Sequence, residues 1–579
     1  MLQSIRRSRC FGPLLLALLG VLSPGAGRSD VTPYGPLDRL HPVVARNGMA
    51  VTQEALATRA GVDILRQGGN AVDAAVAIGF ALAVTLPQAG NLGGGGFMLV
   101  YDAAEKRSEA IDFREVAPAA IRRNFYLNEN GEVDETRIRH SHQAAGVPGT
   151  VAGLALAHGR HGHLPWPKLI APAIRLAEQG IAVSPELAQS LQESRGRMAR
   201  WPASLKQFFK PDGSAHQAGE TLAQPDLAAS LKLIAEHGPP AFYQGEIARR
   251  LVADMKAHGG LIEPDNLKRY RAVVREPVRG SYRGYDIVSM PPPSSGGVHL
   301  IQLLNMMETW PLAELGAGSA AAMHRMAEAM KVAYADRSEY LGDPDFVKIP
   351  VAGLISKAYA KELAGRIDPN RARPAPAIKP GQPQRYESEQ TTHYSVIDRD
   401  GNAVAVTYTL NFPYGSAIVA AGTGILLNNE MDDFAAKPGT PNAYGLIGGD
   451  ANAVAPGKRP LSSMSPTIVL KDGQPVLVTG SPGGSRIITT VLQIISNVID
   501  HNMNIAQATL APRFHHQWLP DELRIEEGFS PDTVRLLRAF GHTIAVKDAL
   551  GDTQSIAREP GGLYGFSDLR RPGGSAAGY

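Results

Sequence analysis

A strongly patterned β-hairpin near residue 400 constrains the fold more than any other feature of the sequence. Residues 391–397 are rich in threonine, tyrosine, valine and isoleucine, Asp398-Arg-Asp-Gly401 supplies a turn, and 403–410 returns with a similar composition. A second hairpin is predicted at 466–479, with its turn at Lys471-Asp-Gly473. Two antiparallel hairpins argue against a regular alternation of parallel strands and helices.

The rest of the chain supplies helices and one further strand pair. Helices are predicted within 52–86, 150–200, 225–258 and 486–499, and Gln67-Gly-Gly-Asn70 divides the first of these segments into two. A strand at 97–101, a polar turn at 103–108 and a return strand at 111–115 form another hairpin. The pattern predicts a mixed α and β chain folded as a layered sandwich, with helices outside sheets.

The N-terminus has the layout of a secretory signal peptide. Arg6, Arg7 and Arg9 precede an apolar run from Phe11 to Leu22, and small residues follow up to Gly27. The apolar run is too short for an ordinary membrane-spanning helix, so we expect residues 1–27 to be removed on export.

Composition excludes several classes of protein. Cys10 is the only cysteine and lies before the apolar run, so the exported chain would have no disulfide, thiolate nucleophile or cysteine metal ligand. Such a chain must be stabilised by a large core. The formal charge is only +3 and no basic run occurs, which argues against nucleic-acid binding. No metal site is expected: His393, His501, His515 and His516 lack metal-binding spacing, and the adjacent pair is expected on a polar surface.

Two glycine-rich runs lie at points where a strand meets another element. Neither Asn91–Gly96 nor Gly480–Gly484 matches a phosphate-binding loop, and each could be a tight turn. In the second run the backbone N–H groups of Gly483 and Gly484 could face a developing oxyanion.

Residues 371–390 are rich in proline and polar side chains, and we expect this segment to be mobile. It ends abruptly at Thr391, where the first hairpin begins. A threonine hydroxyl within a chain is a poor nucleophile, but at a new N-terminus its own α-amine can take the proton. The residue pattern alone leaves both interpretations open, a nucleophile or simply the start of a strand.

Several motifs together resemble the γ-glutamyltranspeptidase family. They are Asn91–Gly96, Asp112-Phe-Arg-Glu115, Met290-Pro-Pro-Pro-Ser-Ser-Gly-Gly297, Thr391-Thr-His-Tyr-Ser395, Asn428-Asn-Glu-Met-Asp-Asp433, Arg459-Pro-Leu-Ser-Ser-Met464 and Thr479-Gly-Ser-Pro-Gly-Gly-Ser485. The resemblance runs from about residue 40 to Tyr579 and is closest to the bacterial periplasmic enzymes. It implies an α+β N-terminal-nucleophile hydrolase with a four-layer αββα sandwich.

The resemblance also implies that the precursor cuts itself between Gln390 and Thr391. Residues 28–390 would form a large subunit and 391–579 a small subunit, and the two would remain together as one catalytic heterodimer. The expected location is the periplasm or the exterior, with no membrane attachment after signal cleavage and no nucleic-acid partner.

The implied reaction is cleavage of the γ-glutamyl amide of glutathione and related compounds through an ester on Thr391. Water or an acceptor amino acid or peptide would then take the glutamyl group, and no cofactor is implied. The residues implied in catalysis are Thr391, Thr409, Gly483 and Gly484.

The resemblance assigns substrate contacts as well. Arg114, Ser462 and Ser463 would bind the α-carboxylate of the substrate. Asn411, Glu430 and Asp433 would bind its α-ammonium group. Residues 438–449 would form a lid, with Tyr444 as its gate.

Two alternatives remain open from the sequence. One is a glutaryl amidase resembling cephalosporin acylase, although a glutaryl group has no α-ammonium and so less need of Glu430 and Asp433. The other is an inactive protein that binds γ-glutamyl peptides, or a scaffold that is never processed.

Overall fold

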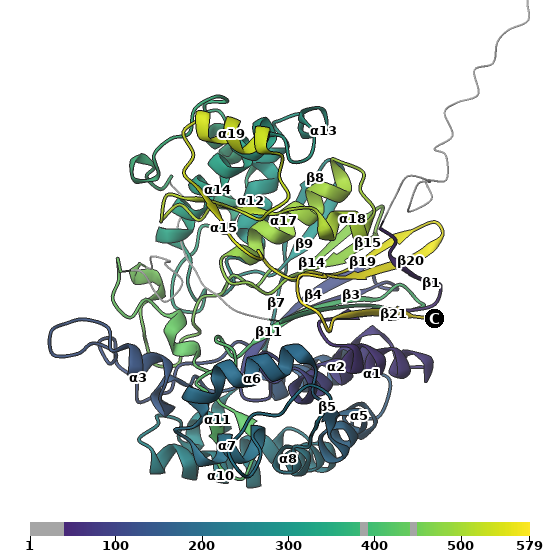
Figure 1. Cartoon of the computed structure of the whole chain (residues 1–579), viewed down its shortest axis with the longest axis vertical. Coiled ribbons are helices and arrows are strands. Elements are labelled where there is room, and N and C mark those ends of the chain that lie inside the picture. The colour runs from purple at the N-terminus through teal and green to yellow at the C-terminus, as the bar shows by residue number, and fades with distance from the viewer. Residues whose placement is uncertain (1–39, 382–391, 441–448) are drawn as a thin grey trace, which may run out of the picture.

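The computed structural model describes residues 40–381, 392–440 and 449–579. Two seven-stranded sheets, antiparallel throughout, lie face to face at its centre (Figure 1). The first sheet has the strand order β1 (Val43–Ala45), β20 (Gly562–Ser567), β19 (Gln554–Glu559), β15 (Gln474–Thr479), β14 (Thr467–Lys471), β9 (Tyr285–Ser289) and β8 (Val278–Tyr282). The second has the order β21 (Ser575–Gly578), β2 (Met49–Thr52), β10 (Thr392–Ile397), β11 (Ala403–Thr409), β3 (Gly95–Asp102), β4 (Arg107–Asp112) and β7 (Val273–Arg275).

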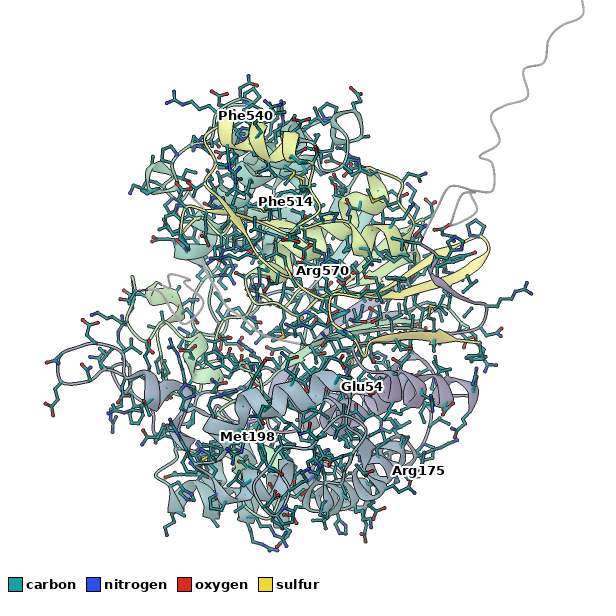
Figure 2. The ribbon with its side chains drawn as sticks, viewed as in Figure 1. Glu54, Arg175, Met198, Phe514, Phe540 and Arg570 are labelled. Carbon is teal, nitrogen blue, oxygen red and sulfur yellow. The ribbon has the colours of Figure 1, made fainter. Side chains whose placement is uncertain are left out.

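Helices cover the outer face of each sheet, which confirms the expected αββα sandwich. The layer on the second sheet, at the bottom of Figure 1, contains α1 (Ala55–Arg66), α2 (Ala71–Thr85), α4 (Thr150–His161), α5 (Trp166–Gln179) and α8 (Pro225–His237). The layer on the first sheet, at the top, contains α12 (Gly296–Met307), α14 (Ala320–Tyr340), α17 (Arg486–Ile499) and α18 (Ile505–Leu510). Figure 2 shows Arg175 and Met198 in the lower part of the molecule and Phe514 and Phe540 in the upper part.

Further elements surround these layers. On the lower side they are α3 (Glu135–Arg139), β5 (Ile181–Ala182), α6 (Pro185–Met198), α7 (Pro202–Phe208), β6 (Thr221–Leu222), α9 (Pro240–Tyr243), α10 (Glu246–Ala257), α11 (Pro264–Arg269), β12 (Val419–Ala420) and β13 (Ile425–Leu426). On the upper side they are α13 (Leu312–Leu315), α15 (Val351–Leu354), α16 (Lys357–Ala364), β16 (Phe514–His515), β17 (Leu523–Ile525), α19 (Pro531–Ala539) and β18 (Ile544–Val546). Among the described residues, no helix combines the length and apolarity needed to cross a bilayer.

Strand β11 is buried on both faces, and its side chains divide between two cores. Val404, Val406 and Tyr408 pack in the core between the second sheet and the lower helices, whereas Ala403 and Ala405 face the opposite sheet. This alternation is the period of two expected of a strand. The central hairpin is therefore clamped between a helical layer and a second sheet.

All three predicted hairpins and the helix at 486–499 are confirmed. The return strand expected at 111–115 is placed wrongly: β4 is Arg107–Asp112, and Phe113 still exchanges two backbone hydrogen bonds with Gly96 before the chain leaves the sheet. Sequence reasoning also missed the hairpin of β8 and β9, because strand 278–282 exposes polar residues and lacks a continuous apolar pattern.

The segment expected to be mobile is anchored along the part that the structure describes. Ala372 N–H donates to Phe540 O at 2.7 Å, and Ala375 N–H donates to the Asp521 carboxylate at 2.8 Å. Farther on, Gly381 N–H donates to Asp336 Oδ1 at 2.7 Å. The expectation of mobility is wrong for 371–381, because proline-rich backbone here finds hydrogen-bond partners on the upper layer. Residues 382–390 lie outside the described residues.

Two glycines of α4 give a matched test of how tightly this fold packs next to Arg114. A Cβ on Gly153 would lie 2.2 Å from Cγ of Phe113, whereas one on Gly159 would meet no described heavy atom within 4 Å. We expect Gly153→Ala to lower stability by about 1–3 kcal/mol, since the packed core cannot take the methyl group. Gly159→Ala should raise stability by about 0.5–1 kcal/mol, as alanine favours helices over glycine. Thermal and urea unfolding measure both, and a stabilised Gly153→Ala protein would contradict the packing.

Candidate active site

The candidate site is built at one end of the second sheet, where four strand ends meet. Thr392 pairs with Tyr408, Thr409 pairs with Gly95, and Phe97 pairs with Asp112. The start of β10, the end of β11, the Asn91–Gly96 run and the end of β4 are therefore neighbours. Segments about 300 residues apart in sequence reach the same place because adjacent strands of this sheet come from distant parts of the chain.

Two predicted residues, Thr391 and Tyr444, lie outside the described residues. Thr409 is buried, and its Oγ1 accepts the backbone N–H of Asn411 at 2.7 Å. Asn411 has a positive φ of 74° and donates its side-chain amide to Asn429 O at 3.0 Å. Thr409 and Asn411 thus form a compact turn after β11, and that turn is bonded to the residue before Glu430.

Arg114 is the electrostatic centre of the site. Its side chain is 1% exposed, and its guanidinium donates to both Glu430 and Asp433, while Nε donates to Pro460 O at 3.1 Å. Burial lowers the pKa of Arg114, but the charges of Glu430 and Asp433 outweigh it and the net shift is upward. The structure thus brings three of the predicted substrate-binding residues together.

A third carboxylate, Glu115, adjoins this cluster, and sequence reasoning gave it no role. It is fully buried, lies 3.7 Å from Nη1 of Arg114, and has no hydrogen-bond partner for either carboxylate oxygen among the described residues. Burial raises its pKa to about 8, and burial also raises the pKa of Glu430. One guanidinium cannot balance three buried carboxylates, so the raised pKa values favour the neutral forms of Glu115 and Glu430 unless a further cation joins the cluster.

Ser462 and Ser463 directly follow Pro460 and Leu461, whose carbonyl oxygens accept hydrogen bonds from Arg114. Leu461 O accepts from Nη2 of Arg114 at 3.4 Å, and Ser462 Oγ accepts the N–H of Met464 at 3.1 Å. Ser463 Oγ accepts a hydrogen bond from Arg337, a buried residue of α14 that also donates to Ser295 Oγ at 3.0 Å. Because Arg337 supplies a donor, the Ser463 hydroxyl must direct its own hydrogen elsewhere. Arg337 has no motif that sequence reasoning could have used.

Gly483 and Gly484 lie in the loop that joins β15 to α17. Their φ values of 130° and 65° fall in the region that favours glycine. Neither N–H donates a backbone hydrogen bond to an acceptor among the described residues, and the two glycines immediately precede Ser485, the N-cap residue of the 14-residue helix α17. Such amides at the positive end of a helix can stabilise an oxyanion.

His393 of β10 packs against the start of this loop. A Cβ on Gly480 would lie 2.4 Å from the His393 ring, so the loop and the strand are in direct contact. The imidazole is fully buried between Thr407 Oγ1 at 2.9 Å and Ser395 Oγ at 3.1 Å. Burial lowers its pKa to about 3, so His393 stays neutral at ordinary pH.

The histidines predicted on a polar surface are instead buried. His515 bonds Thr489 Oγ1 at 2.9 Å and Gln517 Oε1 at 3.1 Å, and burial lowers its pKa well below the usual value. The adjacent His516 is buried too. The expectation failed because β16 turns this pair inward against α17.

Two groups of potential metal ligands occur among the described residues, away from this site. They are His142 with Asp254 and His258, and His324 with Glu328 and His542. In the first group the two imidazoles stack at 4.5 Å, so their lone pairs do not converge on one point. In the second, His324 Nδ1 bonds His542 Nε2 at 2.8 Å and Glu328 pairs with Lys331 at 2.7 Å. Hydrogen bonds and ion pairs account for both groups.

Comparison with known proteins places this fold and site in a class. The crystal structure of cephalosporin acylase from Bacillus halodurans superposes with a TM-score of 0.84 and 30% identity, covering 95% of this chain and 99% of that one. The Helicobacter pylori γ-glutamyltranspeptidase structure is 46% identical with a TM-score of 0.57, covering 60% of this chain and 97% of that chain. The fold is that of the N-terminal-nucleophile hydrolases.

Sequence comparison identifies the family within that class. The model of the γ-glutamyltranspeptidase family matches residues 57–578, so the chain belongs to this family. The "Glutathione hydrolase proenzyme" of Escherichia coli (strain K12) is 58% identical over 94% of this chain and 93% of its own length.

Proposed function

We propose that this protein cleaves the γ-glutamyl amide bond of glutathione and related compounds and passes the glutamyl group to water, amino acids or peptides. The relative that is 58% identical over nearly the whole chain is a glutathione hydrolase proenzyme, which supports this assignment. Residues 1–27 would direct export to the periplasm.

The observation that carries the proposal is the buried group of Arg114, Glu430 and Asp433. A γ-glutamyl substrate presents an α-carboxylate and an α-ammonium on one carbon. The guanidinium matches the carboxylate, and the carboxyl groups of Glu430 and Asp433 beside it match the ammonium. Ser462 and Ser463, beside Arg114, would add hydrogen bonds to the carboxylate.

In the proposed mechanism the free α-amine of Thr391 takes the proton of its own hydroxyl. Oγ attacks the γ-carbonyl carbon, and the N–H groups of Gly483 and Gly484 stabilise the oxyanion. The C–N bond breaks, the amine leaves with a proton, and a γ-glutamyl ester of Thr391 remains. Water or an acceptor amine then attacks the ester and restores the hydroxyl. Thr409 would orient Thr391, and Asn411 would help to bind the ammonium.

The free amine requires a cut between Gln390 and Thr391. We infer that the Thr391 hydroxyl attacks the Gln390 carbonyl and that water hydrolyses the resulting ester, leaving subunits 28–390 and 391–579. The word proenzyme in the name of the Escherichia coli relative supports processing. The proposed lid, 438–449 with Tyr444, falls largely outside the described residues.

A glutaryl amidase is less well supported. The cephalosporin acylase structure shares the fold at 30% identity. A glutaryl group lacks the ammonium, however, and would leave the Glu430 and Asp433 carboxylates buried without added positive charge. An inactive binding protein would need neither the N-terminal threonine nor the two glycine amides.

Processing is tested on a denaturing gel with N-terminal sequencing of the purified protein. We expect two bands in place of a single chain, the smaller beginning Thr391-Thr-His-Tyr. Thr391→Ala should remain a single chain because it has no hydroxyl. Persistence of a single chain in the wild type would favour the binding protein.

Asp433→Asn tests ammonium recognition, and the neighbouring Asp432 offers a matched control. Asp432 is equally buried but pairs with Arg139 at 2.8 Å instead of Arg114. We expect Asp433→Asn to lower kcat/KM for γ-glutamyl-p-nitroanilide by about 10²-fold or more, as one charged partner is typically worth several kcal/mol when buried. Activity on glutaryl-p-nitroanilide should fall much less.

Asp432→Asn should keep the wild-type preference for the γ-glutamyl substrate. Equal losses on both substrates in Asp433→Asn would show that Asp433 does not read the ammonium. A wild type that prefers the glutaryl substrate would favour the amidase.

A further inference from the structure

A buried series of hydrogen bonds connects the start of β10 to the Gly480–Gly484 loop. Thr392 Oγ1–H donates to Gln53 Oε1, and Gln53 Nε2–H donates to Asp552 Oδ2. Asp552 N–H then donates to Ser481 Oγ at 2.9 Å, and Ser481 O–H donates to Pro482 O at 2.6 Å. The series ends one residue before Gly483.

The series crosses from one sheet to the other. Gln53 directly follows β2, the neighbour of β10 in the second sheet, while Asp552 stands two residues before β19, the neighbour of β15 in the first. Thr392 and Ser481 are fully buried, and Gln53 and Asp552 are 8% and 1% exposed. Water therefore cannot easily replace a lost partner in this series.

The chain is closely packed where the segment around Asp552 meets the Gly480–Gly484 loop. A Cβ on Gly551 would lie 2.7 Å from Ser481 Oγ, and one on Gly483 would lie 3.2 Å from Gly551 Cα. The other oxygen of Asp552 accepts from Gln554 Nε2 at 3.0 Å. Both carboxylate oxygens are thus occupied, and the segment around Asp552 lies against the glycine loop.

We propose that Gln53 and Asp552 are positioning residues that hold the nucleophile at the correct distance from the oxyanion-binding amides of Gly483 and Gly484. Thr392 is the residue after the proposed nucleophile, and Ser481 belongs to the loop that carries the amides. This inference rests on the proposed function, since it assigns a role relative to Thr391. The hydrogen bonds of Gln53 and Asp552 within the described chain do not reach the Arg114 cluster, so their effect should fall on the chemical step.

The charges around Asp552 suit such a role. Burial raises its pKa to about 7, the nearby Asp568 carboxylate adds to this, and Arg571 and Arg513 oppose it. Asp568 is itself paired with Arg513 at 2.5 Å and with Arg570, labelled in Figure 2, at 3.1 Å. The Gln53 amide adds a neutral hydrogen-bond donor to Asp552, and this bond also lowers the carboxyl pKa.

A carboxylate swap tests the proposal without changing the size of either side chain. Gln53→Glu removes the amide donor to Asp552 and places two carboxyl groups in contact, and their repulsion above neutral pH pushes the two ends of the series apart. In the double variant Gln53→Glu/Asp552→Asn, the new carboxylate accepts from Thr392 and from the new side-chain amide at position 552, and Gln554 still finds an acceptor. The number of hydrogen bonds is then restored with the carboxylate and the amide exchanged between the two positions.

We expect Gln53→Glu to lower kcat for γ-glutamyl-p-nitroanilide about 100-fold with KM nearly unchanged, because small misplacements of reacting groups cost this much. The double variant should return kcat to within about tenfold of wild type. If Gln53→Glu blocks processing, the rate at which the purified precursor yields the small subunit is compared across the same variants.

Asp73→Asn is the matched control for loss of a buried carboxylate. Asp73 is fully buried and accepts the N–H of His163 at 3.0 Å, and it caps α2 beside Asp398, at the turn end of the central hairpin. The Asp73→Asn variant should have a lower melting temperature and an unchanged kcat.

The outcomes separate the two proposals. No turnover by the wild type overturns the proposed function. An active wild type with a Gln53→Glu variant of equal kcat overturns the positioning role. A purely structural role would lower melting temperature with kcat per folded molecule preserved, or would leave kcat low in the double variant although it folds, and either result also overturns it.

Discussion

The pairing of β10 with both of its neighbours is the interaction on which the rest of the structure depends. β10 is hydrogen-bonded to β2 on one edge and β11 on the other, and all of its described residues are buried. In the same sheet, β2, β3, β4 and β7 precede residue 390, while β10, β11 and β21 follow it. A cut between Gln390 and Thr391 would therefore leave every described strand pair intact. The two segments would stay together because they share both sheets and neither could bury its strands alone.

The charged cluster at the end of this sheet is costly to bury. Removing a guanidinium and three carboxylates from water carries a desolvation penalty of several kcal/mol per ion, and the attraction between them repays it only in part. Glu115 and Glu430 both have pKa values raised by burial, which shows that Arg114 does not fully compensate them. Such a cluster is poorly explained by stability alone. It is well explained as a preformed receptor that a zwitterionic ligand completes.

Local residue patterns in the sequence were enough to predict hairpins and one helix. The hairpins at β10–β11 and β14–β15 have turn residues between β-forming runs, and α17 has a long apolar stretch, so these elements were predictable. Arg114, Glu430 and Asp433 could be grouped only through resemblance to a family, since more than 300 residues separate Arg114 from its partners.

Gln53, Arg337 and Asp552 belong to no recognisable motif. Their roles arise only when the two sheets and α14 pack together. The anchoring of 371–381 and the burial of His515 were mispredicted for the same reason, because tertiary partners satisfied polar groups that looked solvated. Composition cannot show such partners.

The two groups of proposed site residues belong to different sheets, so the proposed reaction depends on the distance between the sheets. Arg114 and the turn after β11, which we propose bind the substrate, lie at the end of the second sheet, whereas Gly483 and Gly484 follow β15 of the first. His393 lies between them, in contact with Gly480. Burial lowers the pKa of this imidazole to about 3, so protonation of His393 itself does not alter this contact near neutral pH. Asp552, whose pKa burial raises to about 7, is instead the group of this junction that can change charge near neutrality. The neutral His393 ring therefore supplies a contact, unaffected by its own charge, between β10 and the loop that carries the proposed oxyanion-binding amides.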